Sequence, residues 1–481
     1  MKSKAYTYTI AVITFVVTVF TPAFLLAEVK LPSILGSHMV LQQGEAVPIW
    51  GLADPGEEVT VVFGAASTSA KADADGKWQV KLPSMKANAK GEKMVVKASN
   101  EIVLEDVLVG EVWLCSGQSN MEWSVSRSTN AKQEIAAANY PLIRHIKIPH
   151  RSSAKAESDV NSGGWQVATP QTTRNFTAVG YYFGRELLNE LKVPIGLIGS
   201  NWGGTRIEPW ISPEGFKAVP ALKEEFADKL DEFPQKRGNG INHQSALALY
   251  NGMISPLLPY AIKGALWYQG ESNNGEGMRY HEKMKALIAG WRSVWNKPDL
   301  PFYFVQLAPF NYRRDRKELP GIWQAQLETL KVPNTGMAVI TDISTLGNIH
   351  PPNKQDVGKR LSLWALAKDY GKKDIVYSGP IFDKADHAEG KDNITVHFQK
   401  LGSKHHGLKT TDGKEPSHFE VAGQDGVWHA AQATIVFGDH LMVKSDKVAA
   451  PAYVRFAWDQ AAMPNLVNGA GLPASPFTSQ K

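Results

Sequence analysis

The order of hydrophobic and polar positions divides this chain into a strand-rich beginning, a mixed middle and a strand-rich end. Short segments in which apolar and polar residues alternate occupy both ends, separated by turn sequences rich in Asp, Pro and Gly. These segments are 58–63, 77–82 and 93–98 near the start, and 394–398, 432–437 and 453–458 near the end. Such alternation predicts antiparallel strands with one buried face. Two β-sandwich-like regions are therefore expected, over residues 28–108 and 376–481.

Between them, residues 109–375 alternate apolar strands with longer segments of helical period. Residues 181–191 form one such segment, and the apolar run 193–199 follows it directly. Further strand candidates are 107–114, 264–268, 302–307 and 337–341, and a helix is expected over 355–367. This alternation predicts an α/β domain with a doubly wound parallel sheet. Ligands of such sheets bind beyond the carboxyl ends of the strands, so the residues after each strand carry the candidate chemistry.

The first 27 residues have the three-part pattern of a secretory signal peptide. Lys2 and Lys4 precede an apolar run over 10–20, and small residues follow up to Ala27. The pattern predicts cleavage near Glu28 and a periplasmic or secreted protein, because the apolar run is short for an uncleaved membrane anchor. We therefore expect no stable membrane association of the mature chain.

The composition is that of a globular protein with more than one domain, at 481 residues and 43% hydrophobic content. The net charge of +5 is spread without a basic run, so nucleic acid is not an expected partner. Fourteen tryptophans and fourteen tyrosines favour a carbohydrate ligand only weakly, since most aromatic residues serve packing. The single cysteine, Cys115, rules out an intramolecular disulfide and is expected to be a buried, unreactive thiol.

Four strand ends carry residues suited to acyl transfer. They are Gly117-Gln118-Ser119-Asn120, Asn201-Trp202-Gly203-Gly204-Thr205, Gln269-Gly270-Glu271-Ser272-Asn273, and a loop from Asp342 to Pro351 that contains His350. Each segment alone has a structural explanation, as a turn, a loop end or a buried carboxylate that ties loops together. Together, at one edge of a parallel sheet, they predict a serine esterase site.

The predicted roles follow from the chemistry of ester cleavage. Ser119 is the candidate nucleophile, and His350 is the candidate base that takes its proton. The developing oxyanion needs donors already in place, and the candidates are the Ser119 amide, the amide of Gly203 or Gly204, and the side-chain amide of Gln269.

The same segments resemble the sialate O-acetylesterase family, a carbohydrate-esterase branch of the SGNH (GDSL-like) hydrolases that is related to certain acetylxylan esterases. The matching pieces are 35–43, 115–123, 202–205, 267–273, 349–354 and 471–477. The resemblance implies an α/β/α esterase core with flanking β-sandwich segments, Ser119 as nucleophile, His350 as base, and removal of acetyl groups from sugar hydroxyls. It implies no metal and no organic cofactor.

The acid that would orient His350 is left open by the sequence. The SGNH pattern has an aspartate three residues before the histidine, where this chain has Gly347. The candidates are Asp342, Glu271 and the neutral Asn348, and a dyad without an acid is the remaining alternative. A carboxylate is favoured because it stabilises the imidazolium that forms during attack.

Substrate contacts are expected from Asn120, Arg206 and Asn273. A guanidinium can bind the carboxylate of sialic acid through two parallel hydrogen bonds, and the alternative for Arg206 is a structural salt bridge with Glu122. Loops 224–244 and 311–319 are candidate pocket walls. The leading function is an exported sialate O-acetylesterase. The alternatives are an esterase of acetylxylan or another polysaccharide and a non-catalytic carbohydrate-binding protein.

Overall fold

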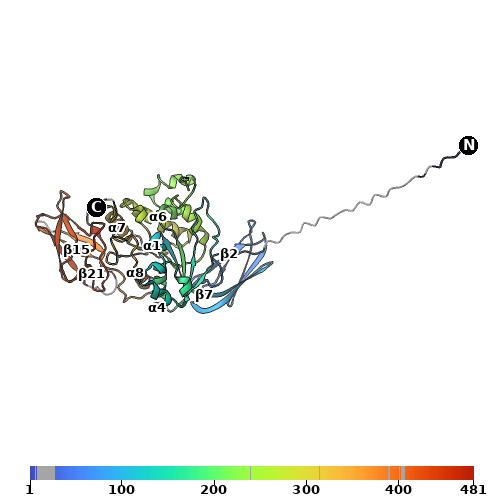
Figure 1. Ribbon diagram of the computed structural model, residues 1–481, viewed down its shortest axis with the longest axis horizontal. Coiled ribbons are helices and arrows are strands. Elements are labelled where there is room, and N and C mark those ends of the chain that lie inside the picture. The colour runs from blue at the N-terminus through green and yellow to red at the C-terminus, as the bar shows by residue number, and fades with distance from the viewer. Residues whose placement is uncertain are drawn as a thin grey trace.

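Three parts follow one another along the length of the molecule: an N-terminal region of strands, a central α/β domain and a C-terminal region of strands (Figure 1). The structure, a computed structural model, describes residues 1–5, 7, 28–238, 240–313, 315–387, 391–399, 401 and 407–480. The predicted signal peptide therefore lies mostly outside the described residues. Within those residues, no helix has both the length and the apolar character that crossing a membrane requires.

Apart from its first strand, which pairs in parallel, the N-terminal region is built from antiparallel strands, as the alternating pattern predicts. The strands are β1 (Val40–Gln42), β2 (Val47–Leu52), β3 (Glu58–Phe63), β4 (Ala66–Lys71), β5 (Lys77–Leu82) and β6 (Asn88–Lys97). β2 pairs with β5, and β3 pairs with both β4 and β6. In β5 every second side chain is buried, beginning with Trp78, so one face of this strand forms core and the other meets solvent.

One long strand, β7 (Glu101–Gly117), connects the first region to the second. Its first part pairs antiparallel with β6, and its last residues lie between β10 (Ile195–Asn201) and β11 (Gly264–Tyr268) in a parallel sheet. The boundary expected at 108/109 therefore falls inside a continuous strand. The pattern changes there because residues 107–117 become buried on both faces, which is typical of a parallel sheet covered by helices.

The central sheet has the order β13-β12-β11-β7-β10-β8-β9. Its remaining strands are β8 (Tyr140–Lys147), β9 (Gln166–Ala168), β12 (Phe302–Val305) and β13 (Thr335–Ala338). All neighbouring pairs are parallel except β8 with β9, which is an antiparallel edge pair. The predicted doubly wound parallel sheet is confirmed.

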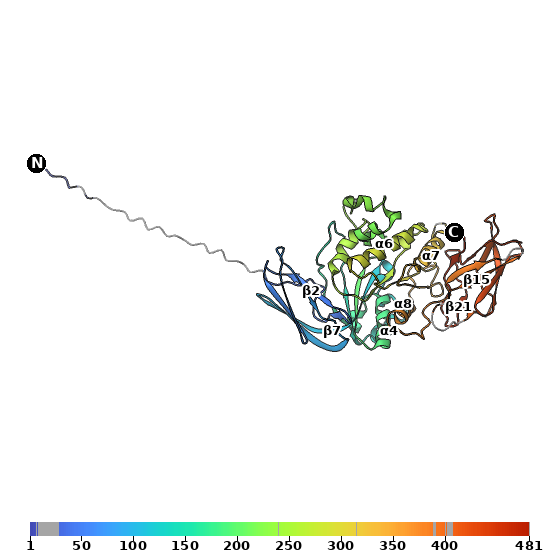
Figure 2. The same ribbon diagram turned by 180° about the vertical axis from the view of Figure 1, so that it is seen from behind.

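Helices cover both faces of this sheet (Figure 2). The longer helices are α4 (Ala178–Leu191), α6 (Arg279–Val294), α7 (Glu318–Thr329) and α8 (Lys354–Lys368), and the short ones are α1 (Ser119–Glu122), α2 (Ala131–Ala136), α3 (Pro170–Thr173) and α5 (Pro213–Ala218). α4 packs against α8, while α5 and α7 pack against α6. Cys115 is fully buried under α4, as expected, and a Cβ on Gly180 would lie 2.7 Å from its sulfur.

The C-terminal region is antiparallel, again as the alternation predicts. Its strands are β14 (Phe382–Asp386), β15 (Asn393–Phe398), β16 (Leu408–Thr410), β17 (Phe419–Ala422), β18 (Trp428–Val436), β19 (His440–Lys444), β20 (Tyr453–Phe456), β21 (Leu466–Asn468) and β22 (Phe477–Thr478). Seven of them form one sheet in the order β14-β15-β19-β18-β17-β20-β22, and β16 pairs with β21. The region contacts the central domain through α7, which packs against β22.

Candidate active site

The nucleophile candidate lies on a sharp turn at the carboxyl end of β7. Gly117 has a φ of 136°, and a Cβ at this position would lie 2.2 Å from the carbonyl oxygen of Tyr268. Only glycine allows this turn without strain. The amide of Gln118 then donates to the same oxygen at 3.0 Å, and α1 begins at Ser119. The half-buried hydroxyl of Ser119 is thus presented at the edge of the sheet.

His350 lies against this hydroxyl, although 231 positions separate the two residues. Its Nε2 is 2.8 Å from Ser119 Oγ, within hydrogen-bond distance. The backbone amide of His350 donates to Asn348 Oδ1 at 2.9 Å, which fixes the turn that precedes the imidazole. The contact between a candidate nucleophile and a candidate base that the sequence predicts is therefore present.

The surroundings of His350 keep its imidazole neutral. Burial, together with the positive charges of Lys354 and Arg127, lowers the pKa of His350 to about 4, and burial contributes most. Trp123 stacks on the imidazole with 4.7 Å between ring centroids and 18° between ring planes. The guanidinium of Arg127 lies over the same indole, 3.6 Å from its centroid. At neutral pH the ring can therefore accept a proton.

No carboxylate in the described part of the chain lies within hydrogen-bond distance of the His350 ring. Asp342 is paired with Arg360 through two bonds of 2.6 and 2.7 Å. Glu271 accepts from the side-chain amide of Asn120 at 2.5 Å. Asn348 contacts the backbone of His350 and not its ring. The geometry is thus that of a serine–histidine dyad, and none of the three orienting candidates has the expected contact.

Two of the expected oxyanion donors are already engaged. The amide of Gly203 donates to Glu122 Oε2 at 2.7 Å. The side-chain amide of Gln269 donates to Thr205 O and to Asn273 Oδ1. Across the described ranges, the amides of Ser119 and Gly204 have no hydrogen-bond partner. These two N–H groups are the donors that the site leaves for a substrate oxygen.

A stack of three rings that the sequence analysis missed lies beside this turn. Trp202 lies between His150, whose ring is nearly parallel to the indole at 4.3 Å between centroids, and His243, at 5.1 Å. His150 Nε2 also contacts Glu122 Oε1 at 2.9 Å. Glu122 thereby connects the α1 helix to the Gly203 turn and to His150. The available signal was the position of His150 just beyond the carboxyl end of β8, where parallel sheets place functional residues.

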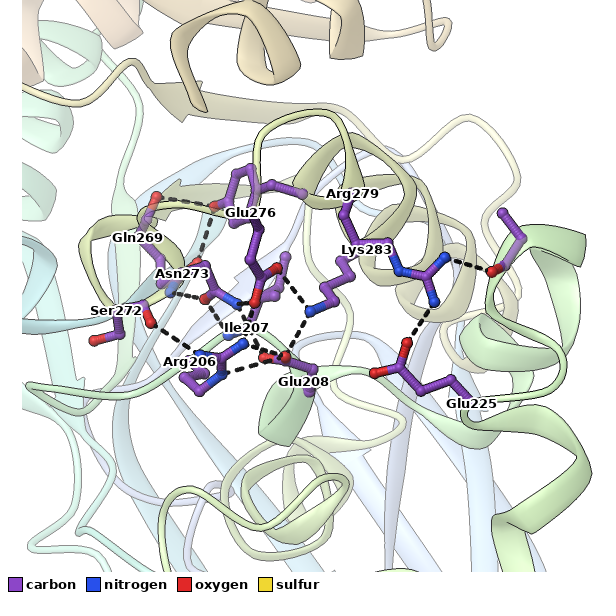
Figure 3. Close-up of polar contacts among 12 residues, drawn as sticks. Arg206, Ile207, Glu208, Glu225, Gln269, Ser272, Asn273, Glu276, Arg279 and Lys283 are labelled. Carbon is purple, nitrogen blue, oxygen red and sulfur yellow. Dashed lines mark hydrogen bonds and ion pairs between the residues drawn. The ribbon is translucent and has the colours of Figure 1, made fainter. Parts of the chain in front are cut away.

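The residues expected to bind substrate are mostly committed to internal contacts. Arg206 forms ion pairs with Glu208 and Glu276, and Lys283 joins the same two carboxylates at 2.7 Å each (Figure 3). The predicted pairing of Arg206 with Glu122 is therefore wrong. The two cations and two carboxylates balance in charge. Their ion pairs connect the 206–208 segment to α6.

The amide side chains Asn120 and Asn273 are both fully buried. Asn273 bonds to Ile207 N, Gln269, Glu208 and Glu276, so it belongs to the ion-pair cluster just described. Asn120 bonds to Glu271, Lys354 and the carbonyl of Ile349. Neither side chain is placed to meet a substrate directly.

Both loops expected as pocket walls contact the site. Gln244 donates to the carbonyl of Gly204 at 2.6 Å, and the amide of Asn311 donates to Leu346 O at 3.1 Å in the His350 loop. A cavity of ≈ 330 Å³ lies beside Gln244, lined among others by Arg206, Phe226 and Arg237. Gly203, the residue before Gly204 in this turn, lies near the nucleophile, because a Cβ added to it would lie 3.2 Å from Ser119 Cβ.

Comparison with known proteins agrees with this geometry. Residues 109–363 match the family model described as carbohydrate esterase, sialic acid-specific acetylesterase. The human sialate O-acetylesterase is 31% identical over 93% of this chain and 92% of its own length, and the rat protein of the same name is 33% identical over 73% of this chain and 76% of its own. The crystal structure of a carbohydrate acetylesterase from Xanthomonas citri superposes with a TM-score of 0.86, at 37% identity over 94% of this chain and all of the other. The chain belongs to the sialate O-acetylesterase family of carbohydrate esterases, which are carboxylic ester hydrolases.

Proposed function

We propose that this chain is an exported sialate O-acetylesterase in which Ser119 and His350 perform the chemistry. One observation carries the assignment of residues, the 2.8 Å contact between Ser119 Oγ and His350 Nε2 at the carboxyl edge of the sheet. Family membership supports the acetylated sugar as substrate.

In the first half of the reaction, Ser119 Oγ attacks the acetyl carbonyl carbon while His350 Nε2 accepts the hydroxyl proton. The carbonyl π electrons move to the oxygen, which the amides of Ser119 and Gly204 stabilise as an oxyanion. The intermediate collapses when the imidazolium returns its proton to the sugar oxygen. The sugar leaves as an alcohol, and acetyl-Ser119 remains.

In the second half, water takes the place of the sugar. His350 removes a proton from the water as it attacks the acetyl group, and the imidazolium then protonates Ser119 Oγ as acetate leaves. The proton that each half-reaction takes is given back, so the site ends in its starting state. Burial of His350 and the cations near it keep the ring unprotonated before each attack.

The assignment of residues is tested with p-nitrophenyl acetate and purified protein. We expect Ser119→Ala to lower kcat by at least about 10³-fold, and His350→Gln to do the same, with little change in thermal stability. Comparable turnover in Ser119→Ala and the original chain would refute the proposed nucleophile.

Sialate as the substrate rests on the family and on the cavity beside Gly204. Arg237 lines that cavity and is exposed, so its guanidinium can meet the carboxylate of a sialic acid. The test compares acetate release from 9-O-acetylated N-acetylneuraminic acid and from acetylated xylan. We expect Arg237→Gln to lower kcat/KM for the acidic sugar and to leave p-nitrophenyl acetate unaffected. A preference for xylan would favour the polysaccharide esterase alternative.

Export rests on the pattern of Lys2, Lys4 and the apolar run that follows. Expression of the full chain in a bacterium with a periplasm, followed by fractionation and N-terminal sequencing, tests it. We expect a periplasmic protein that begins near Glu28. Recovery of the uncut chain from the cytosol would contradict export.

A further inference from the structure

A fully buried lysine lies four residues after His350, and the proposed chemistry gives it no role. Lys354 is 0% exposed and occupies the first position of α8. Its ammonium is in an unfavourable place for two reasons. Burial removes it from water, and the positive end of the helix dipole lies at the same terminus. A lysine so placed lowers stability, so its presence calls for a function in what it contacts.

The contact of Lys354 is the side-chain amide of Asn120, the residue after the nucleophile. Lys354 Nζ donates to Asn120 Oδ1 at 2.5 Å, and the ammonium also lies 5.0 Å from the ring centroid of Tyr268. The amide nitrogen of Asn120 donates to Glu271 Oε1 at 2.5 Å and to Ile349 O at 2.9 Å. The orientation of the amide is fixed, because turning it over would face its nitrogen to an ammonium and its oxygen to two acceptors.

These bonds connect the two segments that carry the reacting groups. Asn120 follows Ser119 on α1, and Ile349 precedes His350 in its loop. The bond between Asn120 and Ile349 therefore joins the nucleophile turn to the base loop one residue away from each reacting side chain. Lys354 holds the amide from one side and Glu271 from the other.

We propose that Lys354 is a positioning residue that, through Asn120, holds the Ser119 turn and the His350 loop at the distance needed for proton transfer. The inference rests on the proposed roles of Ser119 and His350. It assigns to a buried lysine part of the work that an orienting carboxylate does in a triad, since the described residues place no carboxylate on the imidazole.

The charges around the pair support this role. Glu271 on the 3-10 helix Glu271–Asn273 is half-buried, and burial raises the pKa of its carboxyl while Asn120 and Lys354 lower it. Burial lowers the pKa of Lys354, and Glu271 raises it. The charged groups that act on His350 are Lys354 from α8 and Arg127 from the 3-10 helix Val125–Arg127, and both lower the pKa of the imidazole. Removing the Lys354 ammonium should therefore raise the pKa of His350 and move the acid limb of the pH–activity profile to higher pH. It should also change the geometry of the reacting pair.

The test uses the full chain and the variant Lys354→Met, which has nearly the same length but no donor and no charge. Lys359→Met is the matched control, because Lys359 lies on the same helix and is exposed. With p-nitrophenyl acetate we expect Lys354→Met to lower kcat about 10- to 100-fold, to change KM less than twofold, and to move the acid limb to higher pH. The control should match the original chain in all three.

The double variant Lys354→Met/Asn120→Leu is compared with the two single variants. The comparison shows whether Lys354 and Asn120 act as one positioning unit or have two independent structural effects. If Lys354 acts through Asn120, the double variant should lose no more kcat than the worse single variant. Losses that multiply would overturn the proposal, as would an unchanged kcat and acid limb in Lys354→Met. Should Lys354→Met fail to fold, Asn120→Leu must still show the kcat loss with KM unchanged, or the proposal is wrong.

A crystal structure of Lys354→Met tests the positioning without turnover. We expect the Ser119 Oγ to His350 Nε2 distance to exceed 3.5 Å, and a distance unchanged from 2.8 Å would overturn the proposal. The crystal structure and the kinetic assay together distinguish failure of the proposed function from failure of the proposed role of Lys354. A chain that hydrolyses no acetyl ester refutes the proposed function, whereas an active chain whose contact and kcat survive the change refutes only the role of Lys354.

Discussion

The indole of Trp123 lies almost parallel to the imidazole of His350, with 4.7 Å between the two centroids. A second group of stacked rings, formed by His150, Trp202 and His243, adjoins the Gly203 turn. Stacking restricts the rotation of the imidazole, which a carboxylate would otherwise restrict by a hydrogen bond. The site thus orients its base by ring contact and cationic surroundings.

The pH profile of kcat/KM should show this arrangement. His350 is protonated below its pKa of about 4 and can then accept no proton from Ser119, so activity should fall as pH drops through that value. Because Arg127 lowers this pKa, Arg127→Gln should raise it and move the acid limb to higher pH. Lys132→Gln, an exposed cation on α2, is the control. An acid limb that stays in place in Arg127→Gln would contradict the proposed effect of this charge.

Asp342 offers a direct test of the dyad. Its carboxylate is held by Arg360, so Asp342→Asn should keep kcat within about threefold of the original chain and leave the acid limb unchanged. In a triad, the same aspartate-to-asparagine change lowers kcat about 10⁴-fold. A loss of that size, measured with p-nitrophenyl acetate, would contradict the dyad and show that Asp342 is the orienting acid.

The cluster around Glu208 should contribute to stability instead of catalysis. Burial alone would raise the pKa of Glu208, but Lys283 and Arg206 outweigh it and lower the pKa to about 2. Glu208→Gln leaves Lys283 without a full counter-charge, and we expect a loss of about 3–5 kcal/mol in the free energy of unfolding at pH 7. Urea unfolding measures it.

The sign of the pH effect at Glu208 follows from the lowered pKa. The carboxylate stabilises the fold fully above its unfolded pKa near 4.5, and this contribution disappears as pH falls toward 2. The difference in unfolding free energy between Glu208→Gln and the original chain should therefore shrink in that window. A difference that stays constant down to pH 2.5 would show that the effect of the substitution is not electrostatic.

The turn before Ser119 should tolerate no side chain at Gly117. In Gly117→Ala, the new Cβ would lie 2.2 Å from Tyr268 O in a backbone conformation that favours glycine. We expect a stability loss of at least about 2 kcal/mol and a large fall in kcat, because the elbow must shift. Gly36→Ala is the matched change, since no atom lies within 4 Å of its added Cβ. Equal stability and activity of the two variants would contradict the backbone strain expected at position 117.

Much of the fold could be predicted because burial imposes a simple period. The strand expected over 58–63 is β3 with the same bounds, and 264–268 is β11. The helix over 181–191 begins three residues earlier than its pattern suggests, at Ala178, because Thr177 caps it with a side-chain bond to Gly180 N. The capping hydroxyl of Thr177 is a local signal for the start of the helix. The period of the apolar residues alone does not show where the helix begins.

The reacting pair could be inferred from strand ends, but the hydrogen-bond partners around it could not. Gly203 donates to Glu122 across 81 positions, and Asn120 meets Lys354 across 234. Such pairings depend on how loops from different strands meet, and no local pattern encodes them. For the same reason the sequence predicts the wrong partner for Arg206 and indicates no role for Lys354.

The continuity of β7 makes the catalytic turn inseparable from the first region of strands. A single backbone runs from the antiparallel pairing with β6 into the middle of the central sheet and ends at the nucleophile. A fragment cut at residue 109 would begin within this strand and would remove β1, its parallel neighbour at Leu108–Gly110. The esterase domain should therefore not be transferable as an independent module, and any fusion or truncation has to keep the N-terminal strands with it.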